Sequence, residues 1–185
     1  MASLRKYLKE SANYKEFSSS AEISKVLELA ELDLKKGTSI GKLVYDCCWR
    51  FPKKEALEKL IELAKRNDSE RNVVESVFDY ESQQGYSCMI ILFDMAVWYR
   101  NSNNWKYPSG PMLSDIEESV AYLIDLAKKF DLNLKKILNQ TTKHGATLFF
   151  QASAFSEKIT KRLIEEKVKV SSIDDLFLTP FFRVR

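Results

Sequence analysis

The sequence is poor in glycine, proline and histidine, and each shortage excludes a class of structure. Its 185 residues include 5 glycines and 4 prolines, against roughly 7% and 5% in average proteins. Little material is left for the tight turns of a β-sandwich or barrel, or for a glycine-rich phosphate loop. The single histidine excludes chemistry that needs two. These absences favour a helical binding protein over an enzyme, with no cofactor and no bound metal.

Cysteines and long apolar runs are also few. Cys47, Cys48 and Cys88 are odd in number and two are adjacent, so no disulfide framework suits them and we expect a cytosolic or nuclear protein. The longest apolar stretch, residues 88–99, is interrupted by Asp94 and is shorter than the about 20 residues that cross a bilayer. We therefore expect no membrane partner.

Two candidate reactive groups have simpler interpretations. Cys47 and Cys48 could bind a metal together with Cys88, but adjacent helical residues point about 100° apart, which favours buried apolar roles. His144 could act as a base, yet it lies in a Lys-His-Gly sequence with no acid or nucleophile beside it, which favours a turn residue.

A repeated pattern predicts helices. Residues 26–30, 60–64 and 123–127 read VLELA, LIELA and LIDLA, and Ser114 with Glu117 has the spacing of a capping box. We predict helices over 20–36, 53–66 and 115–129. Apolar runs at 43–49 and 89–98 precede two of them. Such short runs also fit buried strands, but their pairing with amphipathic helices favours helical hairpins that stack on one another.

The last third of the chain resembles an ankyrin repeat. Residues 145–153 read GATLFFQAS, residues 159–164 read ITKRLI, and Asp174 precedes Thr179-Pro180-Phe181. Thr179 follows Thr147 at nearly the ~33-residue period of that family. The resemblance implies an all-α, helical-repeat solenoid of stacked helix pairs, in which Leu163 and Ile164 fill the interface between neighbouring units.

Extending this register upstream places Gly41, Gly85 and Gly145 at corresponding positions, with insertions between them. The inserted finger regions, 67–84 and 132–144, each have room for an extra short helix. We expect a single domain over 1–185, divided into an N-terminal cap or divergent unit, three repeat units and the start of a further unit or terminal cap: 1–39, 40–84, 85–144, 145–176 and 177–185.

Aromatic and groove-facing residues are the candidate binding sites. The insert 98–112 is rich in Trp, Tyr and Arg, which are enriched in binding hot spots; alternatively, its rings cover the helix ends. In the ankyrin-like register, Asp94 and Phe155 fall on the groove side of the first helices of their units. Asp94 either faces a partner or forms an ion pair with a lysine or arginine of a neighbouring unit. The predicted partner-binding residues are Asp94, Trp98, Tyr99, Arg100, Trp105, Tyr107 and Phe155.

The whole net charge of +3 arises in residues 139–185. The ordinary explanation of such a charge excess is a solvated helix face. The functional alternative is contact with an acidic partner or a nucleic-acid backbone. The residues concerned are Lys158, Lys161, Arg162, Lys167 and Lys169.

Two functions follow as hypotheses. The first is a non-catalytic scaffold or adaptor that binds another protein through its repeat groove, finger loops and aromatic insert. The second is a helical-repeat module that binds nucleic acid through the basic C-terminal third, with an affinity that falls steeply with salt.

Overall fold

A computed structural model of the chain describes residues 3–10, 20–101, 113–142 and 145–168. These residues form ten α-helices and one isolated β-bridge, between Thr141 and Thr147. The all-α class expected from composition is confirmed. The helices are α1 (Leu4–Glu10), α2 (Ser20–Lys35), α3 (Ile40–Arg50), α4 (Lys54–Ala64), α5 (Glu70–Asp79), α6 (Cys88–Asn101), α7 (Leu113–Lys129), α8 (Leu134–Leu138), α9 (Leu148–Phe155) and α10 (Glu157–Glu165).

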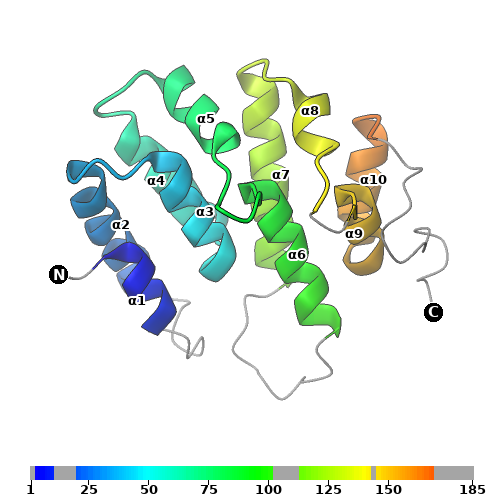
Figure 1. Ribbon diagram of the computed structural model, residues 1–185, viewed down its shortest axis with the longest axis horizontal. Helices are drawn as coiled ribbons and strands as arrows, with labels where there is room; N and C mark the ends of the chain where they lie inside the picture. Colours follow the sequence, from blue (N-terminus) through cyan, green and yellow to red (C-terminus); the bar gives the residue numbers. More distant parts are fainter. Residues whose placement is uncertain (1–2, 11–19, 102–112, 143–144, 169–185) are drawn as a thin grey trace.

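Eight of the helices lie in two packed rows (Figure 1). The inner row runs α1, α3, α6 and α9, and the outer row runs α2, α4, α7 and α10, each helix packing on the next of its row. Each inner helix also packs on the outer helix that follows it in the chain. The two remaining helices, α5 and α8, lie in the connections that lead from an outer helix back to the next inner one.

Inner helices begin with the same kind of cap. The hydroxyls of Ser39, Ser87 and Thr147 accept hydrogen bonds from backbone N–H groups three residues on, over 3.3, 3.3 and 3.2 Å. A hydroxyl at this position satisfies a donor that the first helical turn would otherwise leave unpaired. Ser3 does the same for α1 by accepting from Lys6 N–H.

A glycine with positive φ lies two residues before three of these caps. Gly37, Gly85 and Gly145 have φ of 85°, 74° and 77°, a region that costs side-chain-bearing residues strain. Around Gly85, the backbone N–H of Ser82 donates to the Tyr86 carbonyl, and the Ser82 hydroxyl accepts from Tyr86 N–H. Thr142 and Ala146 make the same two hydrogen bonds around Gly145. The turns that lead into α6 and α9 are therefore built alike.

Gly41 does not occupy the position that the sequence predicts for it. It lies inside α3, and a Cβ added there would come within 2.2 Å of the Ser76 carbonyl oxygen in α5. Gly41 is small because α5 packs directly against the backbone of α3. The residue that corresponds to Gly85 and Gly145 is Gly37.

Paired aliphatic residues fill the contacts of the outer row. Leu60 and Ile61 of α4 are at most 1% exposed, and so are Leu123 and Ile124 of α7. In α10, Leu163 is fully buried, but Ile164 is 53% exposed. The prediction for Ile164 is wrong because no described helix follows α10 in the row.

Side chains of the outer row also tie helix pairs together. Ser119 in α7 donates to the Pro52 carbonyl, between α3 and α4, over 2.9 Å. Ser156, between α9 and α10, donates to the Glu117 carboxylate of α7. The predicted capping box at Ser114 is wrong, because α7 already begins at Leu113 and Glu117 bonds a neighbouring helix pair instead.

The sequence also predicts the outer helices and finger helices well. The expected helices 20–36, 53–66 and 115–129 match α2, α4 and α7 within two residues. Both apolar runs are helical, as α3 and α6, and both finger regions contain the extra helix, α5 and α8. No described helix is long and apolar enough to span a bilayer.

Candidate partner-binding surfaces

The aromatic insert lies mostly outside the described residues. Trp98, Tyr99 and Arg100 belong to the last turn of α6, whose backbone alone is described there. Trp105 and Tyr107 fall in the range 102–112, which is not described. A partner-binding role for this insert stays a prediction.

Asp94 contacts the neighbouring inner helix. Its half-buried carboxylate accepts a hydrogen bond of 2.7 Å from Gln151 Nε2 of α9. The amide hydrogen bond compensates part of the cost of desolvating a carboxylate. Of the two roles considered, this contact between neighbouring helix pairs supports the structural one.

Phe155 is a core residue. Its ring is 6% exposed and meets Phe93 edge to face, with ring centroids 5.6 Å apart. This geometry is favourable for two aromatic rings, and it ties the last turn of α9 to α6. The prediction that Phe155 faces a partner is therefore corrected.

Among the described basic residues of the C-terminal third, Lys161 and Arg162 pair with acids, whereas Lys158 and Lys167 do not. Lys161 contacts Glu157 at 2.6 Å, and Arg162 contacts Asp125 of α7 at 2.6 Å and Glu166 at 3.0 Å. Lys158 and Lys167 are exposed, and Lys169 lies outside the described residues. Two of the four described cations are therefore neutralised within the chain, and Lys143, Arg183 and Arg185 also lie outside the described residues.

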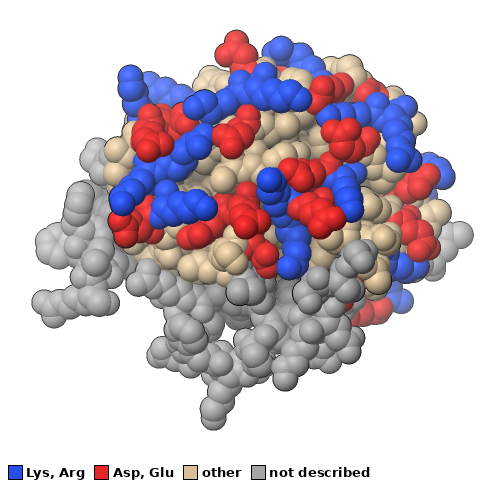
Figure 2. All heavy atoms as spheres, turned by 180° about the vertical axis from the view of Figure 1, so that it is seen from behind, with Lys and Arg blue, Asp and Glu red and all other residues tan. Residues whose placement is uncertain are grey.

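Further ion pairs cross the outer row, on the face where both signs of charge alternate in Figure 2. Glu70 at the start of α5 contacts Lys65 at 2.5 Å and Lys129 of α7 at 3.0 Å, and Lys128 contacts Glu166 at 2.8 Å. Hydrogen bonds from Lys65 and Lys129 lower the pKa of Glu70. These charges connect helices to one another, and we call this surface the outer face.

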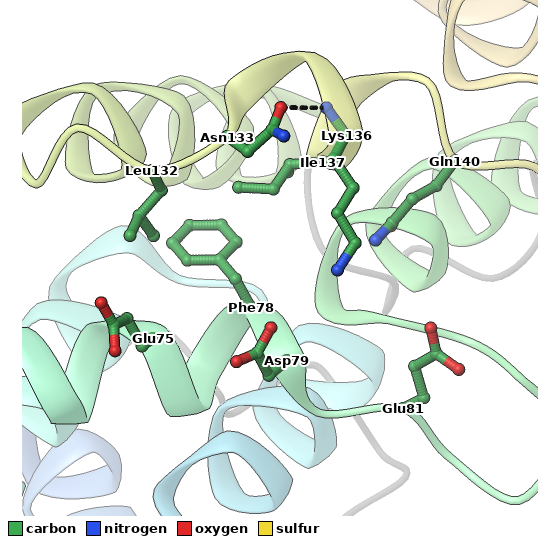
Figure 3. Close-up of a pocket in the computed structure, with 9 residues that line it drawn as sticks. All are labelled: Glu75, Phe78, Asp79, Glu81, Leu132, Asn133, Lys136, Ile137 and Gln140. Carbon is green, nitrogen blue, oxygen red and sulfur yellow. Dashed lines mark hydrogen bonds between the residues drawn. The ribbon is translucent and has the colours of Figure 1, made fainter.

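A different arrangement occurs between the two finger helices. A groove separates α5 from the segment 132–140, which contains α8 (Figure 3). Phe78 and Ile137, each 7% exposed, face each other at its floor beside the half-buried Leu132. The remaining lining residues are polar or charged: Glu75, Asp79, Glu81, Asn133, Lys136 and Gln140.

Hydrogen bonds fix the segment 132–140, which forms the wall of the groove opposite α5. Asn133 accepts from the backbone N–H of Lys136 over 2.9 Å and so begins α8. Gln140 accepts from the hydroxyl of Ser87 over 2.5 Å, which fixes the end of the segment against the cap of α6. The wall therefore rests on the inner row rather than on a free loop.

The groove's charges are mostly unpaired. Asp79, Glu81 and Lys136 are exposed, and none forms an ion pair with any described residue. Glu75 is the exception, because Arg71 contacts it at 2.8 Å from one turn earlier in α5. Opposite charges thus line one hollow of ≈ 150 Å³ without neutralising one another.

The groove is too small for an ordinary cofactor. Sites for drug-sized ligands span about 300–1,000 Å³, whereas a cavity of about 150 Å³ holds a group of benzene size. The hollow has room for a group about as large as one side chain. The groove's shape fits recognition better than the enclosure of a substrate.

The cysteines offer no nucleophile at neutral pH. Cys47, Cys48 and Cys88 are buried free thiols, and burial raises the pKa of Cys88 to about 12. A protonated thiol neither attacks nor binds metal. Within the described ranges, no group of three His, Cys, Asp or Glu could hold a metal ion; His144 lies outside them.

Comparisons with protein-family models, curated proteins and solved structures find no match to this chain. The sequence predicts the finger loops as a binding surface, and every lining residue of the groove falls in the finger regions 67–84 and 132–144, but none of these residues was singled out for binding. The available signals were an acid at i and i+4 on a predicted finger helix, Glu75 and Asp79, and a second finger helix in the next insertion.

Proposed function

We propose that this chain is an ankyrin-like helical-repeat module of the cytosol or nucleus that binds another protein and catalyses no reaction. Its two packed rows support the repeat architecture, because each helix pair packs mainly on the pairs before and after it. The caps that follow Gly37, Gly85 and Gly145 support it independently, since three inner helices start with the same local geometry.

The observation that carries the binding role is the groove between α5 and α8. Two helices inserted into the connections of a stack extend the surface beside the inner row, and between them they leave a hollow with an apolar floor. Asp79, Glu81 and Lys136 make no ion pair with a described residue, unlike the charges that join the helices of the outer face. Desolvated pockets that receive a side chain are typical centres of protein interfaces.

The ion pairs of Lys161 and Arg162 count against the nucleic-acid alternative. Phosphate binding requires cations free to replace condensed counterions, and these two are already matched to carboxylates. Among the described residues of the C-terminal third, Lys158 and Lys167 are the cations without an ion pair, and two lysines make a small cationic surface. The protein-binding hypothesis is therefore the one we carry forward.

Site-specific photo-crosslinking tests the proposal. A photoreactive phenylalanine analogue replaces Lys135, which is exposed on α8 but does not line the groove, or Glu118, which is exposed on α7 in the outer row. We expect a discrete protein adduct at position 135 in native extract and none at 118. Adducts at 118 alone, or at neither position, would contradict the proposal.

Salt dependence separates the two hypotheses. Binding through the groove should change modestly between 50 and 300 mM salt, because few charges are involved. A steep loss of affinity, together with nuclease-sensitive adducts, would support nucleic-acid binding instead.

A further inference from the structure

We propose that the groove between α5 and α8 is a pocket for one arginine side chain of the partner protein. This inference rests on the proposed function and names the chemistry that the groove recognises. Three observations carry it: the size of the hollow, its apolar floor, and the excess of carboxylates over lysine on its rim.

The floor matches the stem of a long basic side chain. Phe78 points from α5 toward Ile137 and Leu132, and the three leave an apolar surface at the bottom of the hollow. Arginine buries its methylene stem along such surface and keeps its charged head at the rim. The hollow of ≈ 150 Å³ is large enough for one such stem and not for a helix.

The rim matches a planar cation. Asp79 ends α5 and Glu81 follows two residues later, so both carboxylates lie along the same edge of the hollow. Neither is neutralised by a described residue. A guanidinium presents its N–H groups in a fork that can meet two carboxylate oxygens at once.

Lys136 shows that a cation is accommodated in this place. Its side chain extends from α8 into the hollow, toward the edge that carries Asp79 and Glu81 (Figure 3). It is exposed and makes no ion pair there. An incoming arginine must displace this ammonium group or share the carboxylates with it. Removing the charge at position 136 should therefore strengthen arginine binding.

A titration with short peptides tests the pocket directly. The probe is acetyl-Gly-Ala-Arg-Ala-Gly-amide, added to the full chain while backbone amide signals are followed by NMR. Matched peptides carry citrulline, which keeps the shape but removes the charge, or glutamate. We expect the arginine peptide to shift signals of residues 78–81 and 133–137, with a dissociation constant near ~1 mM, and the citrulline peptide to bind at least tenfold more weakly.

Variants of the rim locate the binding. The double variant Asp79→Asn, Glu81→Gln should weaken the arginine peptide tenfold or more, and Lys136→Met should strengthen it several-fold. Glu157→Gln on α10 is the matched control, since it removes an exposed carboxylate far along the chain, and it should leave the affinity unchanged. These are exposed positions, and the unperturbed spectrum outside the groove verifies the fold of each variant.

The outcomes distinguish this inference from the function on which it rests. Stronger binding of the glutamate peptide, or arginine binding that survives the double variant, overturns the arginine pocket. If the protein adduct at position 135 forms equally well in the double variant, the chain binds a partner there but not through arginine. If arginine binds and no adduct forms, the pocket stands and the proposed function fails.

Discussion

Charged residues serve different purposes on the outer face and in the groove. On the outer face, Glu166 contacts both Lys128 and Arg162, so one carboxylate joins α7 to α10. In the groove, Asp79 and Lys136 line one hollow and make no ion pair with any described residue. Paired charges hold neighbouring helices together, whereas unpaired ones facing a hollow are available to another molecule. The two regions should therefore respond differently to mutation, pH and ligand.

The largest effect is expected where α5 meets α3. Gly41→Ala places a Cβ 2.2 Å from the Ser76 carbonyl oxygen and 2.6 Å from Tyr80 Cβ, so α5 must move away from α3. We expect a loss of about 1–3 kcal/mol from overpacking, measured by urea unfolding, together with loss of the arginine peptide's binding.

Gly37→Ala is the matched control for that variant. A Cβ at Gly37 meets nothing within 4 Å, so only its φ of +85° is unfavourable, at a cost of about 1–2 kcal/mol. It should leave arginine binding intact. If both variants lost arginine binding equally, the loss in Gly41→Ala could not be assigned to the displacement of α5 from α3.

The next effect is expected at Ser156. Its hydroxyl caps α10 by accepting from Ile159 N–H over 3.1 Å and donates to Glu117 of α7. Ser156→Ala should cost about 1–2 kcal/mol, the usual range for a lost cap, in thermal or denaturant unfolding. Ser156→Asp restores a capping acceptor but repels Glu117, so it should recover only part of the loss. Full recovery would show that the contact with α7 contributes nothing.

A smaller effect is expected from the ion pairs of the outer face. Glu166→Gln removes the carboxylate shared by Lys128 and Arg162 and should cost up to about 1 kcal/mol, less at high salt. Glu157→Gln removes the exposed partner of Lys161 on the same helix and should cost less. If arginine binding changes in either variant, the outer face and the groove are not independent.

The smallest effect is a dependence on pH. Hydrogen bonds from Lys128 and Arg162 hold the pKa of Glu166 below its ordinary value of 4.5. The ionised carboxylate therefore contributes stability that is fully present above pH 4.5 and is lost as the pH falls through the lower pKa of the folded state. The unfolding temperatures of the wild type and Glu166→Gln should converge as the pH falls below 4.5, and a difference that does not shrink on acidification would contradict this assignment.

The helices could be predicted from sequence because their signals are local. The repeated strings at 60–64 and 123–127 identify α4 and α7 through their apolar period. The register failed at Gly41, because apolar content aligned it with Gly85 and Gly145, while the turn geometry that they share belongs to Gly37. The signal that works is a glycine followed two residues later by Ser or Thr.

The groove could not be predicted because it depends on distant parts of the chain. Phe78 and Ile137 face each other only after α5 has packed on α3 and α8 has packed on α7. Phe155 was assigned to a partner for a related reason. Its position on α9 fits a groove-facing residue, but the distance to Phe93 follows from how closely α6 and α9 pack.

Packing between successive helix pairs also bears on how the chain reaches this structure. Principal contacts join helices that are neighbours along the chain or one pair apart, as between α3 and α6 or α4 and α7. Ordering such contacts closes only short loops, which favours fast folding. A nascent chain can therefore complete α1 to α4 before α9 and α10 have been synthesised, and each later pair finds a finished surface on which to fold.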